Sequence, residues 1–228
     1  MKNITKILFI VVISISLQSC DWLKSLVEDD KPKDPNEIKG ETNIPINQVG
    51  NKFTSSVKVG TQYVNLNEEI KITKNESGLL TISIKADPTG SSKIQEYVNK
   101  IPATITDASG KINTTFQVKS TSEGIQDFFN KDGKQHTLVK YDANVGDKYQ
   151  ITKSDGKTIT RTVTQKSSTD DFPYGFMNIK VVTVEQDSRI PGVKKIVYKA
   201  NHKFGLVHVE VFLEDGSTAS SYVYTQNY

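Results

Sequence analysis

The sequence contains one cysteine, Cys20, and only three histidines among its 228 residues. A chain with a single thiol forms no internal disulfide and no cysteine-ligated zinc site. Any folded part must therefore be stabilised by the packing of its core. The histidines, His136, His202 and His208, are scattered along the chain, and two imidazoles without a positioned third ligand do not make a zinc site. We therefore expect neither a metal site nor a bound cofactor.

The sequence also lacks a surplus of charge of one sign. It has 29 Lys and Arg residues against 26 Asp and Glu residues, and Lys2 and Lys6 belong to a segment that we expect to be removed. The remaining 27 basic and 26 acidic residues nearly balance. A protein that binds nucleic acid usually presents a basic surface. We therefore expect no nucleic-acid partner.

Sequence motifs of known catalytic chemistry are missing as well. The chain has no Gly-x-Ser-x-Gly, Gly-x-Gly-x-x-Gly, phosphate-binding loop or His-Glu-x-x-His sequence. Asp170 and Asp171 form an adjacent carboxylate pair that could hold calcium or transfer protons, although such pairs on loops are more often only solvated. Because no nucleophile, base and metal set converges in the sequence, we expect that the protein is not an enzyme.

The N-terminal segment has the organisation of a secretory signal. Lys2 and Lys6 precede an apolar run over residues 7–17, and Leu17-Gln18-Ser19-Cys20 closes that run. The run is shorter than the roughly 20 apolar residues that cross a bilayer. The segment resembles the lipobox of bacterial lipoproteins. The resemblance implies that residues 1–19 are a signal peptide, that Cys20 carries fatty acid such as palmitate, and that acyl groups anchor the chain to a membrane. The alternative is an ordinary signal peptide with an incidental cysteine.

Residues 20–51 are expected to form the lipidated cysteine and a flexible tether. The stretch at residues 29–37 is rich in Asp, Lys and Pro, so it cannot bury enough apolar surface to offset the entropy of ordering it. Trp22 lies beside the acylated cysteine and could rest at the lipid interface. We therefore expect the folded domain to begin at residue 52.

The remaining part, residues 52–228, shows the period-two alternation of strands separated by Gly-containing turns. Asp-Gly and similar tetrads recur because a tight reversal needs a residue that tolerates a positive φ. The pattern predicts a mainly β fold that forms an antiparallel meander. This part of the chain is one domain or two sub-domains, 52–138 and 139–228. The expected hairpins join residues 70–73 to 80–84, 103–106 to 112–118, 149–152 to 158–164, 177–185 to 194–200, and 206–213 to 219–224.

Two segments have the periodicity of a helix rather than that of a strand. The segment at residues 91–100 places apolar residues on one helical face. The segment at residues 122–130 groups Ile125, Phe128 and Phe129 before a turn. Helices this short are marginal alone, so we expect both to pack as lids on the sheet.

The sequence from Tyr141 onward resembles a known group of proteins. Residues 141–149 enter a strand through Gly146-Asp147, and residues 201–207 enter another through Gly205-Leu206-Val207. This layout is similar to that of envelope lipoproteins with a curved antiparallel sheet, and to the half-barrel of the lipoprotein-carrier (LolA/LolB-like) group. The resemblance implies a curved antiparallel sheet, a half-barrel or barrel-like meander, with a concave apolar face that takes up acyl chains. It assigns no functional residue.

The loop at residues 167–176 is the best binding candidate in the chain. It is long for a hairpin connection, and it concentrates three aromatic residues, Phe172, Tyr174 and Phe176. Loops that are held by a rigid scaffold often bind ligands. The three rings could stack on a sugar or contact an acyl chain, or they could fold back as a plug on the edge of the sheet.

The expected function is that of a membrane-anchored envelope lipoprotein that binds a lipid or acyl chain without catalysis. Such a protein needs an apolar pocket lined by alternate strand residues such as Val181, Val197, Val209 and Val211. The alternative is a structural lipoprotein that presents an exposed patch to an envelope protein or a glycan. The frequent Ile, Lys and Asn residues are typical of Bacteroidota, and the outer membrane is favoured. Asp21, however, resembles an inner-membrane retention signal.

Overall fold

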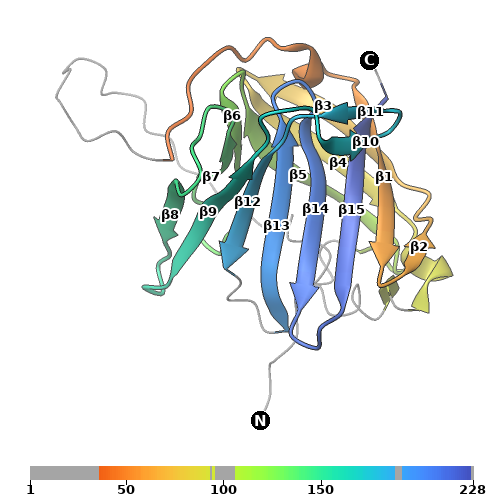
Figure 1. Ribbon diagram of the computed structural model, residues 1–228. Helices are drawn as coiled ribbons and strands as arrows, with labels where there is room; N and C mark the ends of the chain where they lie inside the picture. Colours follow the sequence, from red (N-terminus) through yellow and green to blue (C-terminus); the bar gives the residue numbers. More distant parts are fainter. Residues whose placement is uncertain (1–35, 93, 96–105, 188–191, 227–228) are drawn as a thin grey trace.

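The computed structural model describes residues 36–92, 94–95, 106–187 and 192–226. Within them the chain forms a thirteen-stranded antiparallel sheet and a separate two-stranded sheet, as Figure 1 shows. The expected mainly β fold with a curved antiparallel sheet is confirmed. The signal segment and Cys20 lie outside the described residues. No helix in the described part is long and apolar enough to cross a membrane.

The strands follow one another along the chain, mostly as antiparallel neighbours joined by short turns. Two short 3-10 helices, η1 (Pro45–Asn47) and η2 (Pro88–Gly90), lie among them. The strands are β1 (Lys52–Val59), β2 (Gln62–Val64), β3 (Glu69–Glu76), β4 (Leu79–Ala86), β5 (Ile112–Ser120), β6 (Gly124–Asp127), β7 (His136–Lys140), β8 (Lys148–Thr152), β9 (Thr158–Lys166), β10 (Phe172–Tyr174), β11 (Met177–Ile179), β12 (Val182–Asp187), β13 (Val193–Asn201), β14 (Gly205–Leu213) and β15 (Thr218–Thr225).

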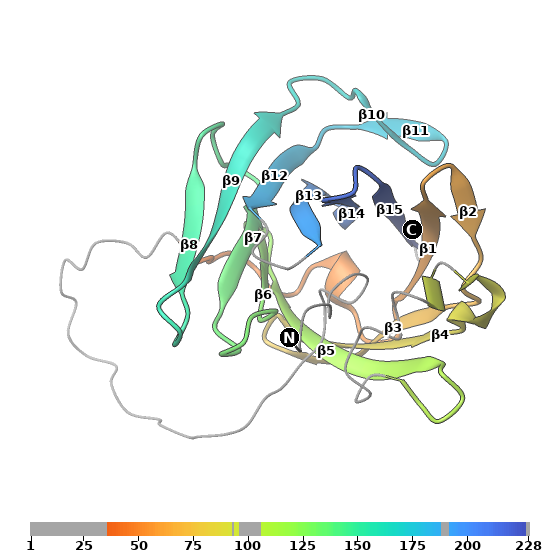
Figure 2. The ribbon, with the colours of Figure 1, turned by 90° about the horizontal axis from the view of Figure 1, so that it is seen from below.

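β1 and β15, the first and last strands along the chain, are neighbours in the main sheet. The order across the sheet is β7-β6-β5-β4-β3-β1-β15-β14-β13-β12-β9-β8, with β2 paired to β1. β1 and β15 are in register from Phe53, which lies opposite Thr225. Residues 52–138 and 139–228 therefore contribute to one sheet. The sheet curls until its two ends approach each other, as the view along its axis in Figure 2 shows.

Bulges account for part of this curvature. The register shifts between Ile72 and Lys74 in β3 and between Thr183 and Val184 in β12. It shifts again in the pairing of β13 with β14. A bulge places an extra residue in one strand, which bends the strand and increases its twist. The result is a barrel-like sheet with an inner and an outer face.

The ends of the sheet, β7 and β8, meet along a seam made by side chains. The Tyr149 hydroxyl accepts a hydrogen bond from Lys140 N at 3.3 Å, and the Tyr149 carbonyl lies 3.1 Å from His136 Nε2. Arg161 Nη1 in β9 donates to the carbonyls of His136 and Thr137 in β7, at 3.2 Å each. These bonds take the place of a backbone ladder and nearly close the sheet.

The segment at residues 122–130 is not a helix, contrary to the sequence prediction. β6 runs through it between β5 and β7, and all four residues of β6 are buried. As a central strand it pairs its backbone groups on both sides, which a single turn of helix cannot do. Ile125 and Phe129 still reach the interior, where the Phe129 ring lies 5.5 Å from the Phe116 ring.

Two further predictions agree with the structure only in part. The strand expected at residues 177–185 is divided, because β11 pairs with β10 in the small sheet while β12 belongs to the main sheet. The helix expected at residues 91–100 is helical at its start, where Ile94 is completely buried. Residue 93 and residues 96–105, on which most of the expected helix falls, lie outside the described residues.

Residues 36–51, which the sequence analysis assigns to the flexible tether, pack against the sheet instead. Asn36 Nδ2 donates to the Gln150 carbonyl at 2.7 Å, and the Asn36 carbonyl accepts from Thr137 Oγ1 at 2.7 Å. Ile38 is almost fully buried. The polar composition of this stretch was misleading because asparagine side chains make many of its contacts, by bonding to backbone groups. The folded domain therefore begins no later than Asn36.

Candidate ligand-binding cavity

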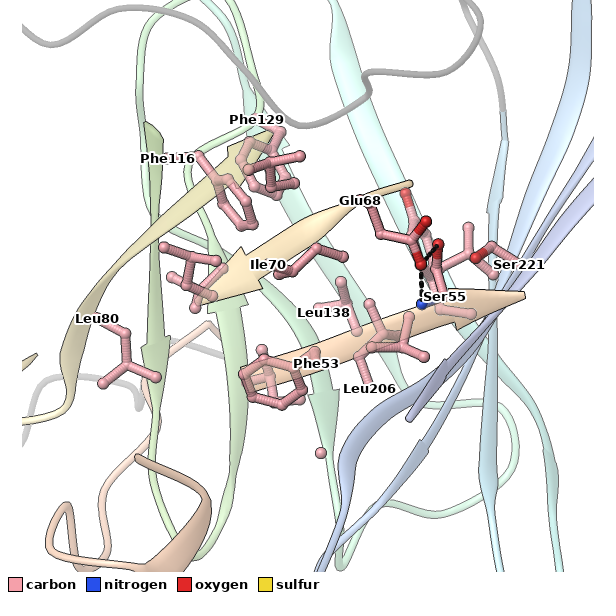
Figure 3. A pocket seen from close by; sticks show the side chains of 18 of the residues that line it. Phe53, Ser55, Glu68, Ile70, Leu80, Phe116, Phe129, Leu138, Leu206 and Ser221 are labelled. Atoms are coloured by element: carbon pink, nitrogen blue, oxygen red, sulfur yellow. Dashed lines mark hydrogen bonds between the residues drawn. The ribbon is translucent and has the colours of Figure 1, made fainter. Parts of the chain in front are cut away.

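The interior of the barrel-like sheet contains a cavity of about 310 Å³. This volume lies at the lower end of the range of small-molecule pockets, roughly 300–1,000 Å³. Figure 3 shows apolar side chains that point into it from several strands. Its lining includes Phe53 of β1, Ile70 of β3, Ile82 of β4, Phe116 of β5, Val211 of β14 and Val223 of β15.

Period-two alternation along β4 and β5 builds one wall of the cavity. Ile82, Phe116 and Val118 line the cavity, whereas Gln117 is exposed on the outer face. These inward apolar residues are only partly buried, while Val139 in the core near the seam is completely buried. Residues of a close-packed interior lose nearly all their accessible surface. The side chains on this wall therefore leave the centre of the sheet unfilled.

The 3-10 helix η1 covers one end of the cavity. Ile46 and Asn47 of η1 line it, and Asn47 Nδ2 donates to the carbonyls of Thr42 and Ser120, at 2.9 Å each. Gly205 lies against Ile46 with a φ of +69°, and a Cβ at that position would be 3.0 Å from Ile46 Cδ1. The backbone conformation therefore favours glycine at this position, and η1 packs closely against it.

A buried apolar cluster bounds the cavity near its opposite end. Ile94 packs there with Val57, Leu66, Ala86 and Ile112. The last four of these residues also line the cavity. The sequence-predicted lid at residues 91–100 therefore contributes at least Ile94 to the packing around the interior.

Glu68 is the only charged residue among the described residues that line the cavity. Its Oε1 accepts hydrogen bonds from Ser55 N at 2.6 Å and from Ser55 Oγ at 3.0 Å. β1 pairs with β3 as far as Phe53 and with β2 from Val57, so Ser55 lies where β1 changes partner. The carboxylate satisfies the Ser55 N–H at this gap. Ser221 of β15 lies beside the pair in Figure 3.

The sequence analysis missed this polar group, although the spacing contained the signal for it. Leu66, Glu68, Ile70 and Ile72 alternate along the chain, and all four line the cavity. A carboxylate at an inward position of an apolar alternation is costly to bury unless it is paired. That conflict between residue type and position marks Glu68 as a candidate functional residue.

Two of the four valines nominated from the sequence line the cavity. Val209 and Val211 do so, whereas Val181 packs in an outer aromatic cluster. Val197 follows Ile196, which lines the cavity, and therefore points to the other face. The prediction is wrong for Val181, which lies outside the strands, and for Val197, which shares its face of β13 with Lys195 and Lys199.

The three rings of the aromatic loop divide between the protein core and solvent. Phe172 and Tyr174 of β10 are 8% and 6% exposed, and they pack on the outer face of the main sheet. The Phe172 ring stacks on Tyr222 at 5.8 Å, and the Tyr174 hydroxyl donates to the Val223 carbonyl at 2.8 Å. Phe176, at the tip of the hairpin, is fully exposed. Phe172 and Tyr174 thus form a plug on the sheet, and none of the three rings lines the cavity.

Two of the histidines are held neutral by their surroundings. Burial, together with the nearby Lys199 charge, lowers the pKa of His208 to about 4, and the His208 ring lies 4.6 Å from the Tyr222 ring on the outer face. Burial, together with the Arg161 guanidinium, lowers the pKa of His136 to about 3 at the seam. At neutral pH His208 packs against aromatic rings, whereas His136 Nε2 bonds to the Tyr149 carbonyl.

The remaining candidates from the sequence lie on the surface. His202, Asp170 and Asp171 are exposed, and Asp171 Oδ1 accepts a hydrogen bond from Ser167 Oγ at 2.6 Å. In the part of the chain that the structure describes, no three His, Cys, Asp or Glu side chains are grouped so that they could hold a metal ion. The cavity is therefore the strongest candidate for a functional site in this part of the chain.

Comparison with known proteins gives one structural similarity. No family model and no curated protein matches the sequence. The fold is similar to the crystal structure of a candidate exported protein with a YmcC-like fold from Bacteroides fragilis NCTC 9343. The two chains are 10% identical, and the match covers 79% of this chain and 97% of the other with a TM-score of 0.42.

Proposed function

We propose that the protein is an exported, membrane-anchored lipoprotein that binds the acyl chain of an amphiphile in its cavity, without catalysis. The observation that carries this proposal is the apolar cavity of about 310 Å³ in the centre of the sheet. Transfer of each methylene group of a chain from water into such a site contributes about 0.8 kcal/mol. An acyl chain is flexible and apolar, so it fits an apolar interior of this volume.

The N-terminal sequence supports the location. Acylation at the lipobox-like Leu17-Gln18-Ser19-Cys20 would attach fatty acid to Cys20 and keep the folded domain outside the cytoplasm. Residues 21–35 then connect the anchor to the domain, which begins by Asn36. A binding domain on a lipid anchor lies close to a source of amphiphiles, and the outer membrane remains the favoured site.

A second candidate function, the binding of a partner protein or glycan, is favoured by one surface feature. Phe176 and Met177 are both exposed at the tip of the β10–β11 hairpin, at 111% and 54%. Adjacent exposed apolar side chains on a tight turn are available for a partner. This surface is separate from the cavity, so the two candidates can be tested independently.

A fluorescent apolar probe, N-phenylnaphthylamine, tests the proposal. Val118→Trp fills the cavity from β5, and Gln117→Trp places the same ring on the outer face one residue away. We expect the wild type and Gln117→Trp to bind the probe with similar affinity. Val118→Trp should bind it at least about tenfold more weakly, because the indole ring fills part of the cavity and removes van der Waals contacts between the probe and the walls. Absence of binding to the wild type, or equal binding to all three, contradicts the proposal.

A further inference from the structure

The position of Glu68 narrows the class of ligand, on the premise of the proposed function. We propose that the cavity selects an amphiphile whose head group donates hydrogen bonds and is not anionic, with a primary amine preferred and a carboxylate or phosphate rejected. The Glu68 carboxylate lies in a lining whose other described residues are uncharged.

The Glu68 carboxylate is fixed in place and has an oxygen available. Both hydrogen bonds from Ser55 go to Oε1, at 2.6 Å from the amide and 3.0 Å from the hydroxyl. Within the described part of the chain, Oε2 has no hydrogen-bond donor. An ionised carboxylate can accept several hydrogen bonds through its two oxygens. Oε2 is therefore positioned to accept one from a ligand.

The described lining of the cavity offers Glu68 no compensating positive charge. No Lys, Arg or His is found among the described residues that line the cavity. A buried charge is stabilised by an opposite charge and opposed by a like charge, and the effect is stronger where apolar groups exclude water. An ammonium head group would supply the missing cation. A carboxylate head group would place a second negative charge in the same apolar space.

Ser221 completes a small polar site opposite the apolar walls. Its Oγ donates to the Tyr222 carbonyl at 3.1 Å, which leaves the oxygen lone pairs free to accept. Figure 3 shows Ser221 beside Ser55 and Glu68, with Phe53 and Ile70 directed into the same cavity. An ammonium group has three N–H donors, so it can bond to Glu68 Oε2 and Ser221 Oγ together while its chain follows the apolar walls.

The structural role of Glu68 does not by itself require a charge. A glutamine at this position keeps an Oε1 acceptor for Ser55 N, removes the negative charge and replaces the Oε2 acceptor with an amide donor. Glu68→Gln therefore separates head-group selection from support of β1. Ser221→Lys provides an independent second variant, because a cation beside Glu68 neutralises the site from another strand.

The experiment is a displacement of N-phenylnaphthylamine by dodecylamine, dodecanol and dodecanoate at neutral pH. These three competitors share one chain and differ in the charge of the head group. We expect the wild type to bind dodecylamine at least about tenfold more tightly than dodecanoate, with dodecanol between them. The negative charge of Glu68 attracts the ammonium group of dodecylamine and repels the carboxylate of dodecanoate. In Glu68→Gln and in Ser221→Lys the ratio of the two affinities should fall to within about threefold. Far-ultraviolet circular dichroism confirms that each variant is folded.

The outcomes distinguish this inference from the proposed function. If all three competitors displace the probe from the wild type with equal affinity, or dodecanoate binds best, the head-group inference is overturned and acyl binding stands. An amine preference that persists in both variants also overturns it. If no competitor binds the wild type, the proposed function fails together with the inference.

Discussion

Arg161 and Asp127 form a completely buried ion pair that joins the two ends of the sheet. Arg161 Nη2 in β9 lies 2.8 Å from Asp127 Oδ2 in β6, and both side chains are 2% exposed. Arg161 Nε also donates to Gln186 Oε1 at 2.8 Å, and Asp127 Oδ1 accepts from Phe129 N at 3.1 Å. Burial raises the pKa of Asp127, and the Arg161 charge opposes that shift. Because both ions are bonded within the protein, the pair fixes how the seam closes.

Removal of one member of this pair should strongly destabilise the fold. Asp127→Asn leaves the Arg161 charge buried without its partner, and such changes cost about 3–5 kcal/mol. The matched control is Glu185→Gln, which breaks a pair that is about one-third exposed, with Lys195 Nζ 2.7 Å from Glu185 Oε2. That change should cost less than about 1 kcal/mol. Urea unfolding measures both, and similar losses in the two variants would contradict a closing role for Arg161.

The pKa of His208 predicts a dependence of stability on pH. Its pKa in the folded protein is about 4 against an ordinary value of 6.5, so the unfolded chain binds the proton more readily. Stability is therefore fully present above pH 6.5 and is lost as the pH falls from 6.5 toward 4. His208→Phe keeps a ring in the cluster and removes the proton site. Between pH 7 and pH 5, the variant should lose about 2 kcal/mol less than the wild type in urea unfolding. Parallel losses in the two proteins would show that His208 does not titrate in this way.

The rings of the aromatic loop should differ in their effect on thermal stability. Phe172→Ala and Tyr174→Ala remove buried rings, and large-to-small changes of aromatic residues in a core cost about 3–5 kcal/mol. Phe176→Ala removes a fully exposed ring and should leave the melting temperature almost unchanged. Thermal unfolding followed by circular dichroism separates the three variants. A large loss in Phe176→Ala, or none in Phe172→Ala, would contradict the packing described for β10.

Gly124 should be intolerant of a side chain. A Cβ at this position in β6 would lie only 2.3 Å from the Val139 carbonyl oxygen of β7, which is backbone and cannot move aside. Gly124→Ala should cost at least about 1–3 kcal/mol through overpacking. A Cβ added to Gly90 would meet no atom within 4 Å, and the backbone there is not in the left-handed region, so Gly90→Ala is the matched control. Equal stability of the two variants in urea would contradict the close pairing of β6 with β7.

Much of the fold could be predicted from the sequence because alternation and turn residues are local signals. The hairpins β3–β4, β8–β9 and β14–β15 lie where the alternation and the Gly-containing turns placed them. β6 could not be recognised, because a strand buried on both faces has no alternation, and Gln126 and Asp127 are buried there as polar residues. Their partners come from distant parts of the chain, and no local pattern contains them.

The candidate site was less accessible to prediction for the same reason. The sequence directed attention to the aromatic loop, where Phe172 and Tyr174 are packed on the outside of the sheet. The pairing of β1 with β15 and the split of β1 between β2 and β3 bring Ser55, Glu68 and Ser221 together. These contacts depend on register over long sequence separations, which only the assembled sheet reveals.

The most direct test of acyl binding is the mass spectrometry of amphiphiles that co-purify with the protein. Wild-type protein, Val118→Trp and Gln117→Trp are purified from bacterial envelopes in parallel, and bound material is extracted with organic solvent. We predict an amphiphile in equimolar amount with the wild type and with Gln117→Trp, and its loss from folded Val118→Trp. No bound amphiphile in the wild type, or an equal amount in Val118→Trp, would contradict the account.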